Sequence, residues 1–234
     1  MWAVATWKGR TRDGPEPWTI DDFRASGRSD WADIARHWDH YGRLQRGVCI
    51  EIGCGPGRLT SALLDDYDRV LGIDVSPDQI ELARQVLGDR VSRVDFSIVE
   101  SPTVEAPPNS CSAMISTHVF QHLSSYSGIV AYLRAAHRAL MPGASICFQT
   151  PVPGADKGDI PSRAYRWFDF LRTQISRALR RHRFMEYNRY PASRIVSTLK
   201  ETGFEDVEVR IFRITATNFR QSFFFARKPP TVEA

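Results

Sequence analysis

The sequence predicts an α/β fold built on a mostly parallel sheet, and three observations lead to this prediction. Apolar, strand-like runs alternate with amphipathic, helix-like segments over positions 48–203. The first apolar run, 48–52, leads directly into a loop with glycine at three alternate positions, after which a helical pattern begins. At the end of the chain two strand-like runs follow each other, 207–214 and 222–227, which predicts a closing antiparallel hairpin.

Periodicity and turn residues place the individual elements. The helix after 129 is expected to close at Met141-Pro142-Gly143, and the last helix begins at Pro191 and stops at Gly203. The parallel strands are predicted at 48–52, 69–73, 94–99, 113–117 and 145–149, and the helices between and after them at 59–67, 77–87, 129–140 and 191–202.

The N-terminal part has its own pattern. Positions 1–17 show no period and are expected to form a loosely held tail, whereas a helical pattern starts at Thr19. Large apolar residues then recur at spacings of three and four, which places them on one helix face. This face consists of Trp31, Ile34, Ala35, Trp38 and Tyr41. Core packing is the simpler interpretation; a helix that caps a bound ligand is the alternative.

Composition limits the class of protein. The chain has 234 residues, of which 42% are hydrophobic and 25% charged, enough for one globular domain with insertions. No apolar run approaches the ~20 residues that span a bilayer, so we expect a soluble, cytoplasmic protein without a transmembrane segment. Its four cysteines lack paired metal-ligand spacing and fall in or beside strand-like segments, which predicts buried thiols.

The glycine loop indicates a nucleotide-type ligand. Glycine permits positive φ and lets a flat or charged ligand lie against the main chain, although a tight strand-to-helix turn also uses glycine for structural reasons. A dinucleotide fingerprint needs a small residue three positions after its second glycine, and Arg58 stands there. A hydride-transfer cofactor is therefore disfavoured.

The pattern Glu51-x-Gly53-x-Gly55-x-Gly57 resembles the first motif of the class I S-adenosylmethionine-dependent methyltransferases and matches it at all four positions. The resemblance implies a Rossmann-like, seven-stranded sheet and S-adenosyl-L-methionine as cofactor. In that family the glycine turn, here with Cys54 inside it, lies against the methionine and ribose part of the cofactor. The acid helps to fix the loop and the methionyl amine.

Asp74 is the candidate ribose ligand. It ends the second predicted strand, where a carboxylate can accept hydrogen bonds from two ribose hydroxyls. A turn residue or helix cap before Val75-Ser76-Pro77 is the alternative. The stretch VLGIDVSPDQIELAR resembles the second motif of the family, which adds Val75 to the cofactor-binding candidates.

Glu100 and Ser101 follow the third predicted strand. The resemblance assigns the Glu100 carboxylate to the adenine amino group and the Ser101 backbone to the adenine ring, although the family commonly has Gly-Asp where this chain has Val99-Glu100. A solvated acid at a strand end is the alternative. Ser112 stands where many members have Asp, and Ala144 replaces a common second glycine.

His118 and His122 are the catalytic candidates. They follow the fourth predicted strand, and open parallel sheets place their chemistry at the carboxyl ends of strands. Histidine suits a general base because its ordinary pKa of ~6.5 lies near working pH. His118, directly at the strand end, is the preferred base, whereas His122 lies in the phrase VFQHL, which resembles an architectural family segment. Two imidazoles without a third ligand do not predict a metal site.

An arginine-rich insertion, 151–190, interrupts the predicted sheet domain. Its part from 161 to 190 carries a net charge of +6, so the remaining chain carries −2. A solvated face of a packed lid helix, a lid that binds an acidic acceptor, and a surface for nucleic acid or anionic membrane are all compatible with this pattern. The predicted organisation is a tail and cap helix (1–45), a cofactor-binding domain (46–150 and 191–228) and the helical lid (151–190).

The resulting functional hypothesis is O-methylation of a small-molecule acceptor, such as a natural product, a sugar or a lipid-like or acidic compound. Methylation of RNA through the basic insertion is one alternative. A protein that binds S-adenosylmethionine without transferring its methyl group is another.

Overall fold

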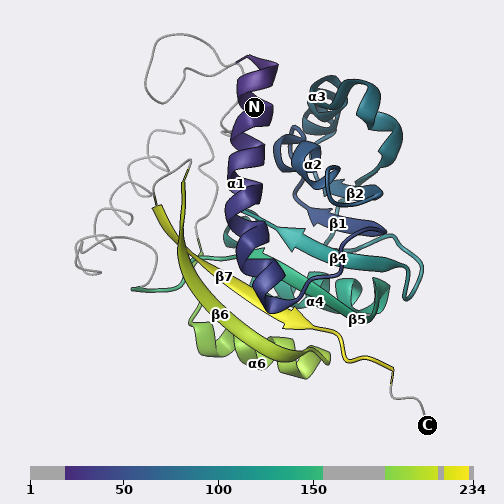
Figure 1. Cartoon of the computed structure of the whole chain (residues 1–234). Helices are drawn as coiled ribbons and strands as arrows, with labels where there is room; N and C mark the ends of the chain where they lie inside the picture. The colour runs from purple at the N-terminus through teal and green to yellow at the C-terminus, as the bar shows by residue number, and fades with distance from the viewer. Residues whose placement is uncertain (1–18, 155–187, 216–218, 232–234) are drawn as a thin grey trace, which may run out of the picture.

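The structure is a computed structural model that describes residues 19–154, 188–215 and 219–231. Seven strands form one sheet in the order β3-β2-β1-β4-β5-β7-β6, with helices on both faces (Figure 1). The strands are β1 (Val48–Ile52), β2 (Arg69–Asp74), β3 (Val94–Ile98), β4 (Cys111–Ser116), β5 (Leu140–Gln149), β6 (Glu205–Ile214) and β7 (Phe219–Arg227). The helices are α1 (Ile20–Tyr41), α2 (Arg58–Leu63), α3 (Pro77–Leu87), α4 (Tyr126–Ala139) and α6 (Ala192–Thr202), with 3-10 turns η1 (Gly88–Arg93) and η2 (Phe120–His122).

The predicted sheet is confirmed. Strands β1 to β5 pair in parallel, and β7 pairs antiparallel with both β5 and β6, which is the expected C-terminal hairpin. From β1 the chain builds outward to β2 and β3 on one side, and β4 then pairs with the other edge of β1. Ligands bind to open α/β sheets at such a reversal, outside the carboxyl ends of the strands. The candidate site is therefore expected where β1 and β4 end.

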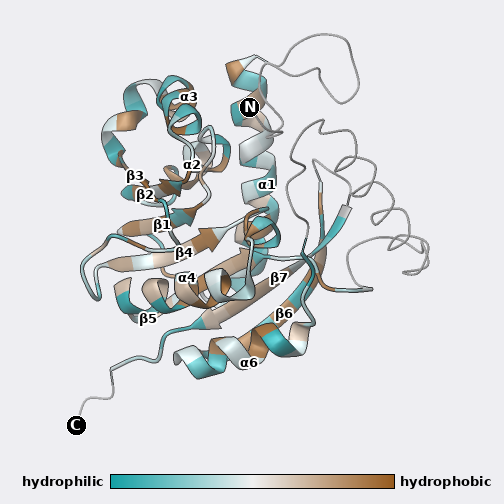
Figure 2. Cartoon of the chain, turned by 180° about the vertical axis from the view of Figure 1, so that it is seen from behind, coloured by the Kyte–Doolittle hydropathy of each residue, from teal (hydrophilic) through white to brown (hydrophobic). Residues whose placement is uncertain are grey.

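Two apolar layers cover the sheet. One contains residues of α4 and α6, and the other contains residues of α1 and α2. The hydropathy colouring shows hydrophobic residues along the central strands and a mixture of both kinds on α6 (Figure 2). Burial of the two sheet faces therefore supplies the main driving force for this fold.

Helix α1 has both of its ends capped. The Thr19 side chain accepts a hydrogen bond from the Asp22 backbone N–H, and the Asp22 carboxylate accepts one from the Thr19 N–H, which is a capping box. At the other end, Gly42 adopts the left-handed conformation that commonly ends helices. The predicted aromatic face is buried, and the Trp38 Nε1–H donates to Ser145 Oγ on β5 at 2.8 Å. The core-packing interpretation of this face is confirmed.

Several predicted boundaries were wrong. Helix α2 ends at Leu63 rather than at 67, and α4 runs from Tyr126 to Ala139 rather than over 129–140. Met141-Pro142-Gly143 lies inside β5, because a register shift between Cys111 and Ala113 of β4 accommodates the positive φ of Gly143. Strands β6 and β7 begin earlier than predicted, at Glu205 and Phe219, so the hairpin is longer than the apolar pattern suggests.

Two predicted regions lie outside the described residues: the N-terminal tail and nearly all of the arginine-rich insertion. The division of the chain into cap, core and lid therefore stays a prediction. Within the described ranges, no helix is both long and apolar enough to cross a membrane. The four cysteines are buried and form no disulfide, as expected.

Candidate functional site

The glycine loop connects β1 to α2 at the carboxyl edge of the sheet. Gly53, Gly55 and Gly57 all have positive φ, at 76°, 51° and 79°. The backbone N–H groups of Gly53 and Cys54 both donate to the Ile73 carbonyl, at 2.7 and 3.0 Å, so the loop is anchored on the end of β2.

The three glycines are required for different reasons. A Cβ on Gly53 would lie 2.0 Å from Cγ2 of Val119, and a Cβ on Gly57 would lie 3.2 Å from that of Ala83. A Cβ on Gly55 would meet no atom of the described residues within 4 Å. Gly53 and Gly57 therefore serve close packing, whereas Gly55 presents bare backbone to open space, as a cradle for a ligand requires.

Asp74 joins this loop to the end of β2. Its Oδ2 accepts from the Gly55 N–H at 2.8 Å and its Oδ1 from the Ser76 N–H at 3.0 Å. The N-cap of α3 is Ser76, so Asp74 is not the helix cap, whereas its hydrogen bond from the Ser76 N–H agrees with the alternative role of a turn residue. Val75, the next residue, is 68% exposed although it is apolar. A half-buried carboxylate and an unprotected apolar side chain thus stand together beside the glycine loop.

Glu100 and Ser101 follow the end of β3, and both are exposed. The Val99 N–H donates to the Asp74 carbonyl at 3.0 Å, which keeps the exit of β3 beside the end of β2. The structure therefore brings Glu100 to the same edge as Asp74, and solvation of its carboxylate agrees equally with the alternative interpretation.

Glu51 and Cys54 are the candidate cofactor-binding residues whose side chains are buried. Glu51 is buried on β1, and its Oε2 accepts a hydrogen bond from the Thr60 hydroxyl at 2.6 Å. Burial, together with the negative charge of Asp74, raises the pKa of the Glu51 carboxyl to about 8. The Cys54 side chain is also buried, and burial raises the pKa of its thiol well above the ordinary value. Cys54 therefore presents backbone, not a thiolate, to the loop.

The raised pKa of Glu51 predicts a pH-dependent stability. A carboxyl whose pKa is about 8 when folded and near its ordinary value of 4.5 when unfolded holds more protons in the folded state between these limits. The free energy of unfolding should consequently fall as pH rises from 5 to 8 through this group, and Glu51→Gln should remove that part of the decline. Urea unfolding of both proteins at several pH values measures it. A constant difference between them across the range would contradict the assignment.

His118 occupies a strained position after β4. Its φ is 59°, unusual for a residue other than glycine, and its backbone N–H donates to Gln149 Oε1 at the end of β5, at 3.0 Å. His118 is partly exposed to solvent, but desolvation by the surrounding protein lowers the pKa of the imidazole. The positive charges of Arg58 and His122 lower it further. The ring is therefore neutral at neutral pH and able to accept a proton.

His122 lies at the end of the 3-10 turn η2, with its Nε2 3.3 Å from Nε2 of Gln121. The positive charge of His122 contributes to the lowered pKa of His118, which places the two rings in one electrostatic environment. Among the residues that the structure describes, no group of three or more His, Cys, Asp and Glu side chains is arranged to hold a metal ion.

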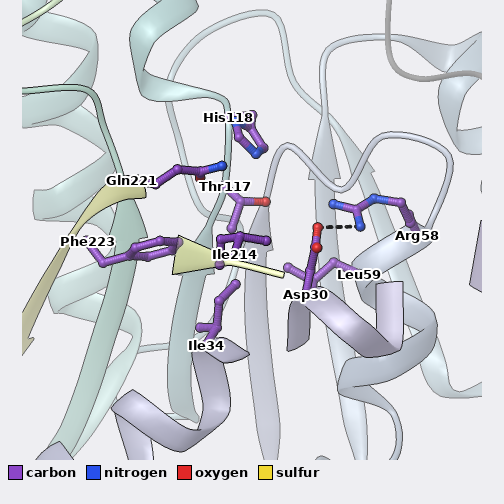
Figure 3. A pocket seen from close by; sticks show the side chains of 9 residues that line it. All are labelled: Asp30, Ile34, Arg58, Leu59, Thr117, His118, Ile214, Gln221 and Phe223. Carbon is purple, nitrogen blue, oxygen red and sulfur yellow. Dashed lines mark ion pairs between the residues drawn. The ribbon is translucent and has the colours of Figure 1, made fainter. Parts of the chain in front are cut away.

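A small cavity lies beside His118, between α1, the start of α2 and the ends of β4, β6 and β7 (Figure 3). Arg58 Nη1 forms an ion pair with Asp30 Oδ2 of α1 at 2.5 Å across it. Sequence reasoning did not find Asp30, Gln149 or Gln221. The available signal for Asp30 was an acid next to Trp31 on the apolar face of a helix, which is costly to bury unless it is paired.

The strand order and the edge hairpin define a Rossmann-like α/β protein, and a comparison with protein families finds a match over part of the chain. Residues 49–143 match the family described as "Methyltransferase domain". Residues 49–143 are therefore a methyltransferase domain, and together with the order of the strands they support the resemblance of the chain to class I S-adenosylmethionine-dependent methyltransferases.

Curated relatives match the same part of the chain. A malonyl-[acyl-carrier protein] O-methyltransferase of Paenibacillus sp. (strain JDR-2) is 33% identical over 117 residues, which are 48% of this chain and 41% of the relative. A trans-aconitate 2-methyltransferase of Sinorhizobium fredii (strain NBRC 101917 / NGR234) is 30% identical over 122 residues, 51% of this chain and 42% of the relative. The chain thus spans less than half the length of these two relatives.

Solved structures share the fold. Phosphoethanolamine N-methyltransferase 2 of Haemonchus contortus, in complex with S-adenosyl-L-methionine, superposes with a TM-score of 0.62 at 18% identity, covering 92% of this chain and 58% of that one. An S-adenosylmethionine-dependent methyltransferase from Mesorhizobium loti gives 0.61 at 17% identity, covering 89% and 100%. At these identities the likeness establishes the fold.

Proposed function

We propose that this protein is an enzyme that transfers the methyl group of S-adenosylmethionine to an oxygen atom of a small-molecule acceptor. The observation that carries the proposal is the arrangement at the carboxyl edge of the sheet. There, Asp74 at the end of β2 holds the Gly55 N–H of the loop after β1, and His118 follows β4, the other neighbour of β1. The names of the two curated relatives, malonyl-[acyl-carrier protein] O-methyltransferase and trans-aconitate 2-methyltransferase, support a small or carrier-bound acceptor.

The residues present fit the cofactor. The open side of Gly55 leaves room for a ligand against the backbone, and the half-buried Asp74 carboxylate can accept hydrogen bonds from ribose hydroxyls. The exposed Val75 side chain offers an apolar surface for a purine ring, and Glu100 and Ser101 would face its polar edge. S-adenosylmethionine, when bound, supplies an electrophilic methyl group.

The protein itself must align the acceptor with the methyl group and take up the proton of the acceptor. A hydroxyl acceptor must lose its proton as it gains the methyl group, and a neutral His118 imidazole nitrogen is able to receive that proton. The hydrogen bond from the His118 N–H to Gln149 fixes the backbone from which the ring projects. Helix α1 covers this edge of the sheet and helps to exclude water from it (Figure 1).

Calorimetric titration with S-adenosylmethionine and S-adenosylhomocysteine tests the first half of the proposal. Transfer of a tritiated methyl group from S-adenosylmethionine to pools of small hydroxyl compounds and to RNA tests the second. We expect binding of both nucleosides and label in the small-molecule fraction. Binding without transfer to any pool would favour a non-catalytic role, and label in RNA at low salt would favour the alternative acceptor.

Replacement of His118 by alanine should lower kcat on a hydroxyl acceptor about 100-fold, because general bases contribute about 10²–10⁴ in rate. Its affinity for S-adenosylhomocysteine should stay within about twofold, since no cofactor contact is assigned to the ring. Because the pKa of His118 is lowered, the wild-type rate should stay level from pH 8 down past the ordinary histidine pKa of 6.5 before it falls on the acid side. Steady-state kinetics over this range measure both effects.

His122→Ala is the matched control for this prediction. It removes a second imidazole from the same segment and should leave kcat within about threefold of wild type. Equal losses in the two variants would remove His118 from the role of base and indicate a common structural effect.

A further inference from the structure

The cavity beside His118 contains an incompletely satisfied charge. Asp30 is 6% exposed, and while its Oδ2 pairs with Arg58, its Oδ1 is buried and has no hydrogen-bond partner among the described residues. A buried polar atom left in this state destabilises the folded protein. In Figure 3 the carboxylate rises from α1 into the space below His118 and Thr117.

The other lining groups define what this space accepts. Ile34, Leu59, Ile214 and Phe223 form apolar walls, and the polar groups are Thr117, His118 and Gln221 in addition to the ion pair. Arg58 is the cation among the lining residues, and its Nη1 is engaged both by Asp30 and by the Ser26 carbonyl at 3.2 Å. A ligand group therefore meets an unfilled acceptor oxygen and a guanidinium whose charge is already matched.

The size of the cavity restricts the ligand further. Its volume is about 10 Å³, which is space for about one water or one hydroxyl or amine group. A carboxylate is larger, and it would place a second negative charge next to Asp30 in a poorly solvated site, which is unfavourable.

We propose that this cavity takes a hydroxyl or amine group of the methyl acceptor other than the hydroxyl that is methylated, that Asp30 Oδ1 accepts its hydrogen bond, and that acceptors with a carboxylate in its place are rejected. This inference rests on the proposed function and narrows its acceptor class. It excludes the acidic acceptors that the arginine-rich insertion suggests. It also separates this chain from relatives whose names contain malonyl and trans-aconitate.

Binding of three carbon-matched probes to the wild-type protein saturated with S-adenosylhomocysteine tests the inference. The probes are benzyl alcohol, benzylamine and benzoate, titrated to millimolar concentration by saturation-transfer NMR. We expect the alcohol and the amine to bind at least about tenfold more tightly than benzoate. Benzoate binding as tightly as either, or no binding of any probe, overturns the inference. This comparison needs no variant, so it holds even where a variant fails to fold.

Asp30→Asn is the informative variant, because it keeps the shape of the side chain and removes its charge. It should abolish the preference for benzylamine over benzoate and leave the affinity for S-adenosylhomocysteine within about twofold of wild type. A loss of nucleoside affinity of about tenfold or more would instead assign Asp30 to the cofactor and overturn the inference.

Asp33→Asn is the matched control. Asp33 is a second buried acid on α1, where it pairs with Arg36 and accepts the Thr215 N–H, and it does not line the cavity. This variant should keep the probe preference, and loss of the preference in it would overturn the assignment to Asp30. If the wild type binds neither S-adenosylmethionine nor its demethylated product, the proposed function fails by itself, and the same probes titrated without nucleoside still decide the character of the cavity.

Discussion

Asp74→Ala is expected to weaken binding of S-adenosylmethionine about 100-fold, which corresponds to about 2.7 kcal/mol. Two effects add. The variant loses the carboxylate proposed to accept ribose hydroxyls, and hydrogen bonds to charged groups are worth about 1.5–3 kcal/mol. It also frees the Gly55 N–H, now held at 2.8 Å, so the loop loses one of its anchors. Calorimetric titration of the two proteins measures the effect.

Asp78→Ala is the control for this prediction. Asp78 is an exposed acid in the first turn of α3, four residues further along the chain. Its removal changes the net charge equally but should leave the nucleoside affinity within about twofold. Comparable affinity losses in the two variants would mean that general electrostatic attraction, and not a specific contact of Asp74, holds the ligand.

The parts of this structure that sequence could predict are those set by local signals. The glycine loop followed an apolar run, and Asp74 ended another, so both fell at strand ends that a parallel sheet brings to one edge. The aromatic face of α1 was readable from spacing because a helix that packs on a sheet must be apolar along one side.

Contacts between distant segments were not predictable from such signals. Asp30 meets Arg58 across the cavity, and Gln149 accepts from the His118 N–H, 31 residues earlier in the chain. No local pattern encodes either pair, because each depends on how the sheet aligns separate elements. The Met141-Pro142-Gly143 turn was misplaced for the same reason, since it lies in an irregularity of β5 between Leu140 and Ser145, which pair with Cys111 and Ala113 of β4.

One departure from the family pattern has a structural explanation. Ser112, where many members have Asp, donates from its Oγ to the Arg46 carbonyl at 2.6 Å and lies 3.1 Å from the Val48 carbonyl. These contacts hold the entry of β1 at the start of β4, away from the carboxyl edge of the sheet. A carboxylate there would face two carbonyl oxygens, so serine suits this position, and its presence does not weaken the candidate site.

Gly53→Ala is expected mainly to lower the stability of the protein, whereas Gly55→Ala is expected mainly to weaken nucleoside binding. At Gly53 the Cβ would lie 2.0 Å from Val119, in addition to the strain of a positive φ, so Gly53→Ala should cost about 3 kcal/mol or more in stability. That cost corresponds to a Tm lower by roughly 10 °C for a chain of this length. At Gly55 the backbone strain remains, about 1–2 kcal/mol, but the Cβ enters open space. Gly55→Ala should therefore lower the Tm only by roughly 4 °C.

Relative to its small loss of Tm, Gly55→Ala should lose more affinity for the nucleoside than Gly53→Ala does. The Cβ of Gly55→Ala would occupy the space in which the loop backbone is proposed to meet the nucleoside, so its affinity should fall about 100-fold while the protein stays folded. Gly53→Ala combined with Val119→Ala removes the nearest clashing methyl group and should recover part of the lost Tm, because the strain at φ 76° persists but the overlap is relieved. Calorimetric unfolding and nucleoside titration of the same samples separate packing from binding. If Gly55→Ala binds S-adenosylmethionine as tightly as wild type, the loop does not carry the ligand at that face, because a methyl group of ordinary size could not share the space with it.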